Sequence, residues 1–147
     1  MVKQNFYNLT FEELKTFLTE KVGIEKGKVK MRAQQLYKAI YQKGLISLND
    51  LTTVTRDLRK ELDNVLSLDL PKIVKKEVAD DKTIKWLLEL NDENKNLIEV
   101  VLIPSKTHNT ICVSVQVGCA MSKNSACIHC ATGTQLLVKN LSTSEIV

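Results

Sequence analysis

The chain has 147 residues, of which 44% are hydrophobic and 26% charged, and its formal net charge is +4. This length suffices for one ordinary core or two small units, and no apolar run approaches the roughly 18 residues of a membrane-spanning helix. Because the amino terminus also lacks the apolar segment of a secretory signal, we expect a soluble cytoplasmic protein with no membrane partner.

Short helices are expected in residues 1–70. Thr10 and Glu13 have the spacing of a capping box, in which each side chain satisfies a backbone N–H at the start of a helix. An apolar stripe then follows at helical spacing as far as Val22. The first helix is therefore expected to begin just after Thr10.

Two further helices complete this half of the chain. Apolar residues recur every three or four positions over residues 29–43, and Gly44 is a plausible stop signal. A third helix is expected over residues 55–66, before Pro71 ends the helical pattern.

Positive charge is concentrated in the second helix. Residues 21–43 contain seven Lys and Arg side chains and one Glu, and seven minus one leaves a local excess of six. Such a patch suits contacts with phosphates, because each neutralised phosphate releases counterions. A simple solvated helix face is the alternative.

After Pro71 the apolar period changes to two, which is typical of strands. The alternation is clearest over residues 83–90, 97–103 and 110–117, and a first strand is expected at about 72–79. The turn-forming residues between these segments predict an antiparallel set of four strands.

All four cysteines lie between Cys112 and Cys130, and three of them form a Cys-x7-Cys-x2-Cys set: Cys119, Cys127 and Cys130. Three thiolates from one loop can hold a four-iron cubane and leave one iron open to a substrate or cofactor. The Cys-x2-Cys element is equally a zinc signature, for which Cys112, His108 or His129 could supply a fourth ligand. Spacing alone leaves both metals open.

Other segments, taken with this loop, carry a resemblance to a known family. They are residues 32–36 (RAQQL), 40–44 (IYQKG), 85–88 (KWLL), 98–104 (IEVVLIP), 110–121 (TICVSVQVGCAM), 130–135 (CATGTQ), 139–141 (KNL) and 145–147 (EIV). In this order they resemble the RlmN-type dual-specificity ribosomal and transfer RNA adenine-C2 methyltransferases of the radical SAM superfamily.

The resemblance implies an α+β fold: an amino-terminal helical domain, followed by antiparallel strands that lead into the start of a truncated radical-SAM α/β barrel. The expected domains are a helical RNA-binding domain at 1–70, a β segment at 71–104 and the beginning of the radical-SAM core at 105–147. Because only 17 residues follow Cys130, most of the barrel is expected to be missing. A separate carboxy-terminal fragment is therefore a candidate partner, and no methyl transfer is expected from this chain alone.

The activity implied by the resemblance is methylation of carbon 2 of adenosine in 23S rRNA and in tRNA. It would use S-adenosyl-L-methionine, a [4Fe-4S] cluster and an electron donor protein. By the same resemblance, Glu99 matches a proton acceptor and Cys112 a thiol that helps to resolve a covalent protein–RNA intermediate. The cluster ligands correspond to Cys119, Cys127 and Cys130. RNA docking is expected through the basic helix, at Lys28, Lys30, Arg32, Lys38 and Lys43.

Two features depart from the family pattern. The family spacing is Cys-x3-Cys-x2-Cys, whereas this chain has Cys-x7-Cys-x2-Cys, and the family has an aromatic residue where this chain has His129. Without the resemblance, Cys112 would be read as a small buried residue, and Glu99 as either a carboxylate in water or a partly buried acid with a raised pKa. The alternative functions are a small zinc-containing RNA-binding module, with ligands Cys112, Cys119, Cys127 and Cys130, and an inert remnant that binds no metal.

Overall fold

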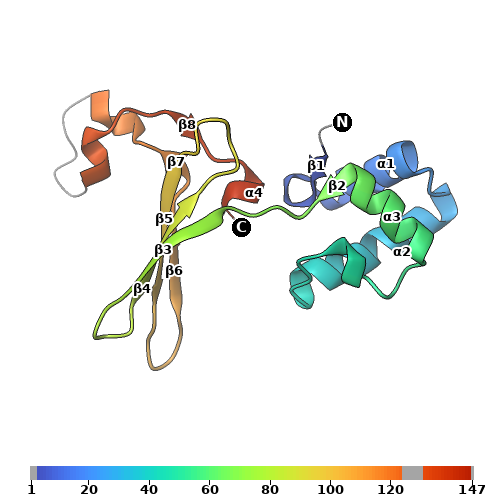
Figure 1. The fold of residues 1–147 in the computed structure, drawn as a ribbon, viewed down its shortest axis with the longest axis horizontal. Helices are drawn as coiled ribbons and strands as arrows, with labels where there is room; N and C mark the ends of the chain where they lie inside the picture. The colour runs from blue at the N-terminus through green and yellow to red at the C-terminus, as the bar shows by residue number, and fades with distance from the viewer. Residues whose placement is uncertain (1–2, 124–130, 147) are drawn as a thin grey trace. The chain divides into compact units, whose positions relative to one another are not determined.

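The computed structural model describes residues 3–123 and 131–146, and the chain divides into two compact units between Asp69 and Leu70 (Figure 1). The first unit is mainly helical, and the second is built on antiparallel strands. Among the described residues, no helix combines the length and the apolar character needed to cross a lipid bilayer.

The helical unit contains three α-helices connected by short turns. Two strands pair in parallel at its ends, β1 (Gln4–Asn5) with β2 (Leu66–Ser67). The other elements are η1 (Phe6–Asn8), α1 (Phe11–Val22), α2 (Lys26–Tyr37), the π-helical segment η2 (Lys38–Gln42), η3 (Leu48–Asp50) and α3 (Arg56–Val65).

The capping box expected at the start of α1 is confirmed. The Thr10 hydroxyl accepts a hydrogen bond from the Glu13 N–H at 3.3 Å, and the Glu13 carboxylate accepts one from the Thr10 N–H at 2.8 Å. The Thr10 hydroxyl also donates to the Glu13 carboxylate at 2.7 Å, and this bond, followed by the one from the Thr10 N–H, lowers the pKa of Glu13. At the other end Gly23 has a φ of +73°, the left-handed conformation that commonly ends a helix. Local sequence therefore determines both ends of α1.

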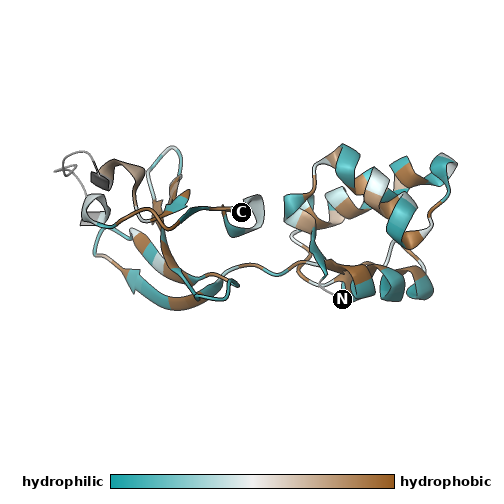
Figure 2. Ribbon diagram, turned by 90° about the horizontal axis from the view of Figure 1, so that it is seen from above, coloured by the Kyte–Doolittle hydropathy of each residue, from teal (hydrophilic) through white to brown (hydrophobic). Residues whose placement is uncertain are grey.

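One apolar core holds the helical unit together. Side chains from all of its helices contribute to it, and the hydropathy colouring in Figure 2 shows that these helices carry both apolar and polar residues. Its largest fully buried members are Phe6, Leu14, Leu18, Leu36, Leu51, Leu62 and Leu66. Leu14 and Leu18 of α1 follow the three-and-four spacing visible in the sequence, whereas Phe6, Leu51 and Leu66 come from outside the α-helices.

The second helix differs from the expected single helix over 29–43. It begins three residues earlier, at Lys26, and after Tyr37 it widens into η2, where the Lys43 N–H bonds to the carbonyl oxygen five residues before it, on Lys38. The apolar spacing identifies the buried face, which includes Ala39 and Ile40. It does not determine the number of residues in the last turn.

The second unit contains the four-stranded antiparallel sheet expected from the sequence. The strands are hydrogen-bonded in chain order: β3 (Lys72–Val78), β4 (Ile84–Glu89), β5 (Leu97–Ile103) and β6 (Thr110–Val113). The fourth strand is shorter than expected. Instead of running over 110–117 it ends at Val113, and β7 (Gln116–Val117) pairs with β8 (Lys139–Asn140) in a separate two-stranded sheet. Short turns η4 (Ala120–Lys123) and η5 (Ala131–Thr134) and helix α4 (Thr143–Ile146) complete the unit.

Candidate active site

The two residues expected to be catalytic lie on one face of the antiparallel sheet. Cys112 in β6 stands opposite Val101 in β5. Two positions further along each strand, the Ser114 hydroxyl donates to the Glu99 carbonyl oxygen at 2.9 Å and accepts from the Glu99 N–H at 3.4 Å. Side chains two residues apart on a strand share a face, so Glu99 and Cys112 are diagonal neighbours. The Cα atoms of such a pair are typically roughly 7–8 Å apart.

The Glu99 side chain is exposed and paired with a lysine. Its carboxylate lies 3.2 Å from Lys85 Nζ on β4, and Lys85 also lies 3.5 Å from Glu77 on β3. The hydrogen bond and charge of Glu99, followed by those of Glu77, raise the pKa of Lys85. Of the two environments considered for Glu99, the structure has the carboxylate in water, at 56% exposure of the side chain.

Sequence reasoning misses Lys85 as the partner of Glu99. Lys85 stands opposite Val101, and Glu99 is opposite Leu87, so the two charged residues are also diagonal neighbours, across the β4–β5 pair. Only the register of the strands brings them together. The signal in the sequence is the alternation that puts Lys85 on the same face as Leu87.

A cavity of about 340 Å³ opens beside Glu99. One wall comes from β4 and β5, and the other comes from the segments on either side of the cysteine loop. Its lining residues include an acid, a hydroxyl and two amides: Glu99, Ser114, Gln116 and Gln135. Leu87, Leu97, Ile98, Gly118 and Thr132 complete it. A small polar ligand would find both donors and acceptors there.

Cys119 is held next to this cavity by backbone pairing. Its N–H donates to the Gln135 carbonyl oxygen at 3.1 Å, and the Val138 N–H donates to the Val117 carbonyl oxygen at 2.8 Å. The preceding residue, Gly118, has a φ of +76°. The two ends of the loop that carries the metal-ligand candidates are therefore joined to each other.

The remaining cluster candidates, Cys127 and Cys130, lie outside the described residues, as does His129. Within residues 3–123 and 131–146, no three His, Cys, Asp or Glu side chains are grouped as metal ligands. Cys112 is an exposed free thiol rather than a buried small residue, and Cys119 is a half-buried free thiol. His108 forms a 2.9 Å hydrogen bond between its Nδ1 and the hydroxyl of Thr107.

A second charged cluster, which we call the clasp, consists of Asp92, Lys139 and Glu145. Lys139 Nζ lies 2.8 Å from Asp92 and 2.6 Å from Glu145. The side chain of Lys139 is 31% exposed, that of Asp92 is 19% exposed and that of Glu145 is 16% exposed. Asp92 follows β4, whereas the other two residues follow the cysteine loop. The clasp therefore ties the segment after the loop to the β4–β5 turn.

The pKa values within the clasp shift in the directions expected of ion pairs. Hydrogen bonds from the side chains of Asn96 and Lys139 hold the pKa of Asp92 well below its usual range. Burial acts to raise the pKa of Glu145 and to lower that of Lys139. The hydrogen bonds and charges within the clasp outweigh burial, so the pKa of Glu145 is lowered and that of Lys139 is raised.

The basic residues expected to dock RNA lie on α2 and η2. Lys28 pairs with Glu25 at 2.9 Å, and Arg32 donates to Gln35 at 2.9 Å. For Lys30, Lys38 and Lys43, no carboxylate of the described part of the chain lies within ion-pair distance. These three lysines are therefore available to an anionic partner.

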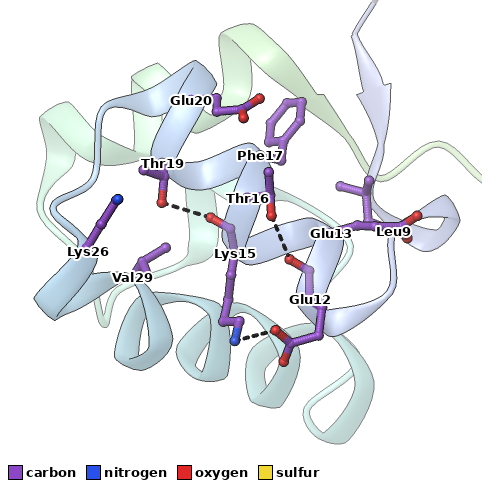
Figure 3. Close-up of a pocket in the computed structure, with 10 residues that line it drawn as sticks. All are labelled: Leu9, Glu12, Glu13, Lys15, Thr16, Phe17, Thr19, Glu20, Lys26 and Val29. Atoms are coloured by element: carbon purple, nitrogen blue, oxygen red, sulfur yellow. Dashed lines mark hydrogen bonds and ion pairs between the residues drawn. The ribbon is translucent and has the colours of Figure 1, made fainter.

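A larger groove, of about 710 Å³, lies along α1 and the start of α2 (Figure 3). Three acidic residues, Glu12, Glu13 and Glu20, line it together with Lys15 and Lys26, and the close-up shows Lys15 paired with Glu12. None of the site residues expected from the sequence lines this groove.

The chain is similar to RNA methyltransferases in both sequence and structure. Residues 4–68 match the family described as the ribosomal RNA large subunit methyltransferase N-terminal domain. A crystal structure of a radical SAM methyltransferase from Sphaerobacter thermophilus superposes on 97% of this chain and 39% of its own, with a TM-score of 0.80 and 32% identity. The chain thus resembles radical SAM methyltransferases in fold and sequence, and its residues 4–68 resemble the amino-terminal domain of the ribosomal RNA enzymes.

Curated relatives narrow the class further. Proteins named dual-specificity RNA methyltransferase RlmN are 40% identical over 130 residues in Nitrobacter winogradskyi and 37% identical over 147 residues in Vesicomyosocius okutanii. These matches cover 86% and 100% of this chain, but 32% and 38% of the relatives. The chain is similar to the RlmN-type family over most of its own length and spans about a third of the length of these relatives. None of these matches supports the alternative of a zinc-containing module.

Proposed function

We propose that this chain supplies the RNA-docking unit and the first part of the catalytic site of an RNA methyltransferase that acts on carbon 2 of adenosine in ribosomal and transfer RNA. The observation that carries the proposal is the position of Glu99 and Cys112. They are diagonal neighbours on one face of the sheet, and Glu99 lines a polar cavity whose wall includes the residue before Cys119.

In this proposal Glu99 accepts a proton from the base or its adduct. Its exposed carboxylate lies 3.2 Å from Lys85 Nζ and offers oxygen atoms that can accept a proton, as a general base must. The exposed Cys112 thiol, on the same face, is within reach of an intermediate formed beside Glu99. The amides and hydroxyl of the cavity would orient the planar base by hydrogen bonds to its edges.

Cys119, Cys127 and Cys130 would hold a [4Fe-4S] cluster, since three thiolates leave one iron open to S-adenosyl-L-methionine. The donor chemistry of the three residues fits such a cluster, and the paired backbone at Cys119 fixes one end of the loop. When bound, the cluster would supply the electron that cleaves the cofactor reductively. An electron donor protein and segments corresponding to the rest of the relatives' length would complete the system.

Anaerobic reconstitution with iron and sulfide tests the cluster. The full chain should become brown and bind iron and acid-labile sulfide, and Cys119→Ala should abolish both. Cys112→Ala is the matched control, since it removes a cysteine from the same segment and should leave metal content unchanged. Stoichiometric zinc in protein purified without oxygen, or equal iron loss in both variants, would contradict the assignment.

RNA binding tests the role of the basic helix. Replacing Lys30, Lys38 and Lys43 by Gln should weaken RNA binding and flatten its salt dependence by roughly 0.7 in log–log slope for each lost contact with single-stranded phosphate. A control that replaces the exposed lysines Lys72, Lys76 and Lys106 changes the net charge equally. Equal weakening in the two triple variants would show that only net charge matters.

A further inference from the structure

Tyr41 is an exposed aromatic ring in a cluster of otherwise covered rings. It is 46% exposed, whereas Phe6 is fully buried and Tyr7 is 7% exposed. The Tyr41 ring centroid lies 5.8 Å from that of Phe6, 5.9 Å from that of Tyr7 and 5.1 Å from that of Tyr37. Three neighbouring rings therefore support Tyr41 and limit the conformational entropy that it could lose on binding a ligand.

The backbone under Tyr41 is a π-helical turn, in which the Lys43 N–H bonds to Lys38 at 3.2 Å. Turns of this kind are rare and are found disproportionately at functional sites. The wider turn keeps Ala39 and Ile40 buried while the next residue, Tyr41, reaches solvent.

Two lysines lie along the helix that leads to this ring. Lys30, Gln34 and Lys38 follow one another at spacings of four residues, which places them along one side of α2, and Tyr41 follows in the π-helical turn. Residues 26–43 contain no Asp or Glu. Burial raises the pKa of the Tyr41 hydroxyl, so the ring is neutral at physiological pH and does not repel phosphates.

A supported aromatic face beside unpaired cations is the combination by which proteins bind unpaired nucleotides. The cations contact the phosphates, and a base stacks on the ring. A peptide partner would have to be acidic or to occupy an apolar groove beside the ring, and neither Tyr41 nor any of the three lysines lines the groove along α1. The chemistry therefore favours a single-stranded or looped nucleic acid over a protein.

We infer that Tyr41 is a stacking platform for one unpaired base of the RNA whose phosphates contact Lys30, Lys38 and Lys43. This inference rests on the proposed RNA-docking function and adds to it a preference for unpaired nucleotides. Duplex RNA would engage the lysines without engaging the ring, because its bases are already stacked in the helix.

The test compares binding of a fluorescent single-stranded oligoribonucleotide and a matched duplex to the full chain. Tyr41→Leu should weaken binding of the single strand about 5- to 100-fold and leave the duplex almost unchanged. Tyr41→Phe, which keeps the ring, should bind within about twofold of the wild type. Ile46→Ala, at another exposed apolar side chain of the same unit, is the matched control and should have no effect.

A second variant keeps the test valid if Tyr41→Leu fails to fold. Tyr41→Trp retains a ring, and its added indole emission should be quenched by the single strand but not by the duplex. Unchanged emission at saturating single strand, or wild-type affinity in a folded Tyr41→Leu chain, would overturn the platform. Failure of the wild-type chain to bind any RNA would instead overturn the proposed docking function, so the two failures are distinguishable.

Discussion

Gly118 shows how one backbone position controls the presentation of a metal-ligand candidate. Its φ of +76° is strained for any other L-residue, and a Cβ at this position would overlap the Leu136 carbonyl oxygen and come within 2.8 Å of the carbonyl carbon. The atoms that would have to move are backbone atoms of Leu136 and Leu137, in the segment that returns beside Cys119. Glycine is therefore required here for both conformation and space.

We predict that Gly118→Ala separates the two ends of the cysteine loop. The unfolding midpoint of the sheet unit should fall markedly, and reconstituted iron content should fall with it. Gly44→Ala is the matched control, because Gly44 also has a positive φ but no atom lies within 4 Å of its missing Cβ. That variant should be destabilised only by the strain of the left-handed backbone, which lowers the free energy of unfolding by about 1–2 kcal/mol. Similar losses in both variants, measured by denaturant unfolding, would show that the close approach to Leu136 is unimportant.

Among the site residues, Glu99 and Cys112 could be identified from the sequence only through the family resemblance. Alternation along each strand gives the face of each residue relative to its own neighbours, but not the register between strands. That register makes the two residues neighbours and also pairs Glu99 with Lys85. Cys127 and Cys130 remain predictions.

At the scale of elements, the clasp connects the β4–β5 turn to a strand and a helix that are distant in the sequence. Asp92 lies between β4 and β5, and Lys139 and Glu145 belong to β8 and α4. The sequence shows Asp92 as turn material, because it lies in the run Asn91-Asp92-Glu93-Asn94. Nothing local in that run indicates a lysine more than 40 positions away, so only the tertiary structure reveals the clasp.

We predict a pH window for the stability contributed by the clasp. The pKa values of Asp92 and Glu145 are lowered on folding, so their contribution is present above their unfolded values of about 3.9 and 4.3 and is lost as the pH falls through the folded values. The pKa of Lys139 is raised, so its contribution is present below about 10.4 and is lost as the pH rises through the folded value. The contribution should therefore be largest between roughly pH 5 and 10.

Lys139→Met tests this window. It leaves two sheltered carboxylates without their cation, so unfolding monitored by Trp86 fluorescence should shift to lower denaturant at pH 7. The difference from wild type should shrink as the pH falls. Lys75→Met is the control, because Lys75 pairs with Glu77 at an exposed site where an ion pair contributes little. A Lys75 variant as unstable as the Lys139 variant would argue against a special role for the clasp.

At the scale of the whole molecule, the two units have separate spectroscopic probes. The three tyrosines, Tyr7, Tyr37 and Tyr41, lie in the helical unit, and the single tryptophan, Trp86, lies in the sheet unit. The units can therefore be followed independently in the unmodified chain.

We predict that the units unfold in separate transitions. Leu36→Ala, in the helical core, should cost about 2–5 kcal/mol and shift the near-ultraviolet circular dichroism of the tyrosines without shifting Trp86 fluorescence. Leu90→Ala, at an equally buried position of the sheet unit, should do the reverse. Coincident shifts of both probes in either variant would mean that the chain unfolds as one cooperative unit.

Taken alone, the sequence determined the features that depend on near neighbours: the capping box at Thr10, the buried face of each helix, the alternation of the strands and their antiparallel order. These follow from hydrogen bonds and periodicities within about ten residues. The family resemblance added which side chains carry the chemistry.

Only the tertiary structure decided where the fourth strand ends, how the loop ends pair at Cys119, and which charges meet in the clasp and at Glu99. Strand register and loop closure join residues far apart in the chain, and several pairings are compatible with the same local pattern. Choosing among them requires the packing of the whole unit, which no local window of the sequence contains.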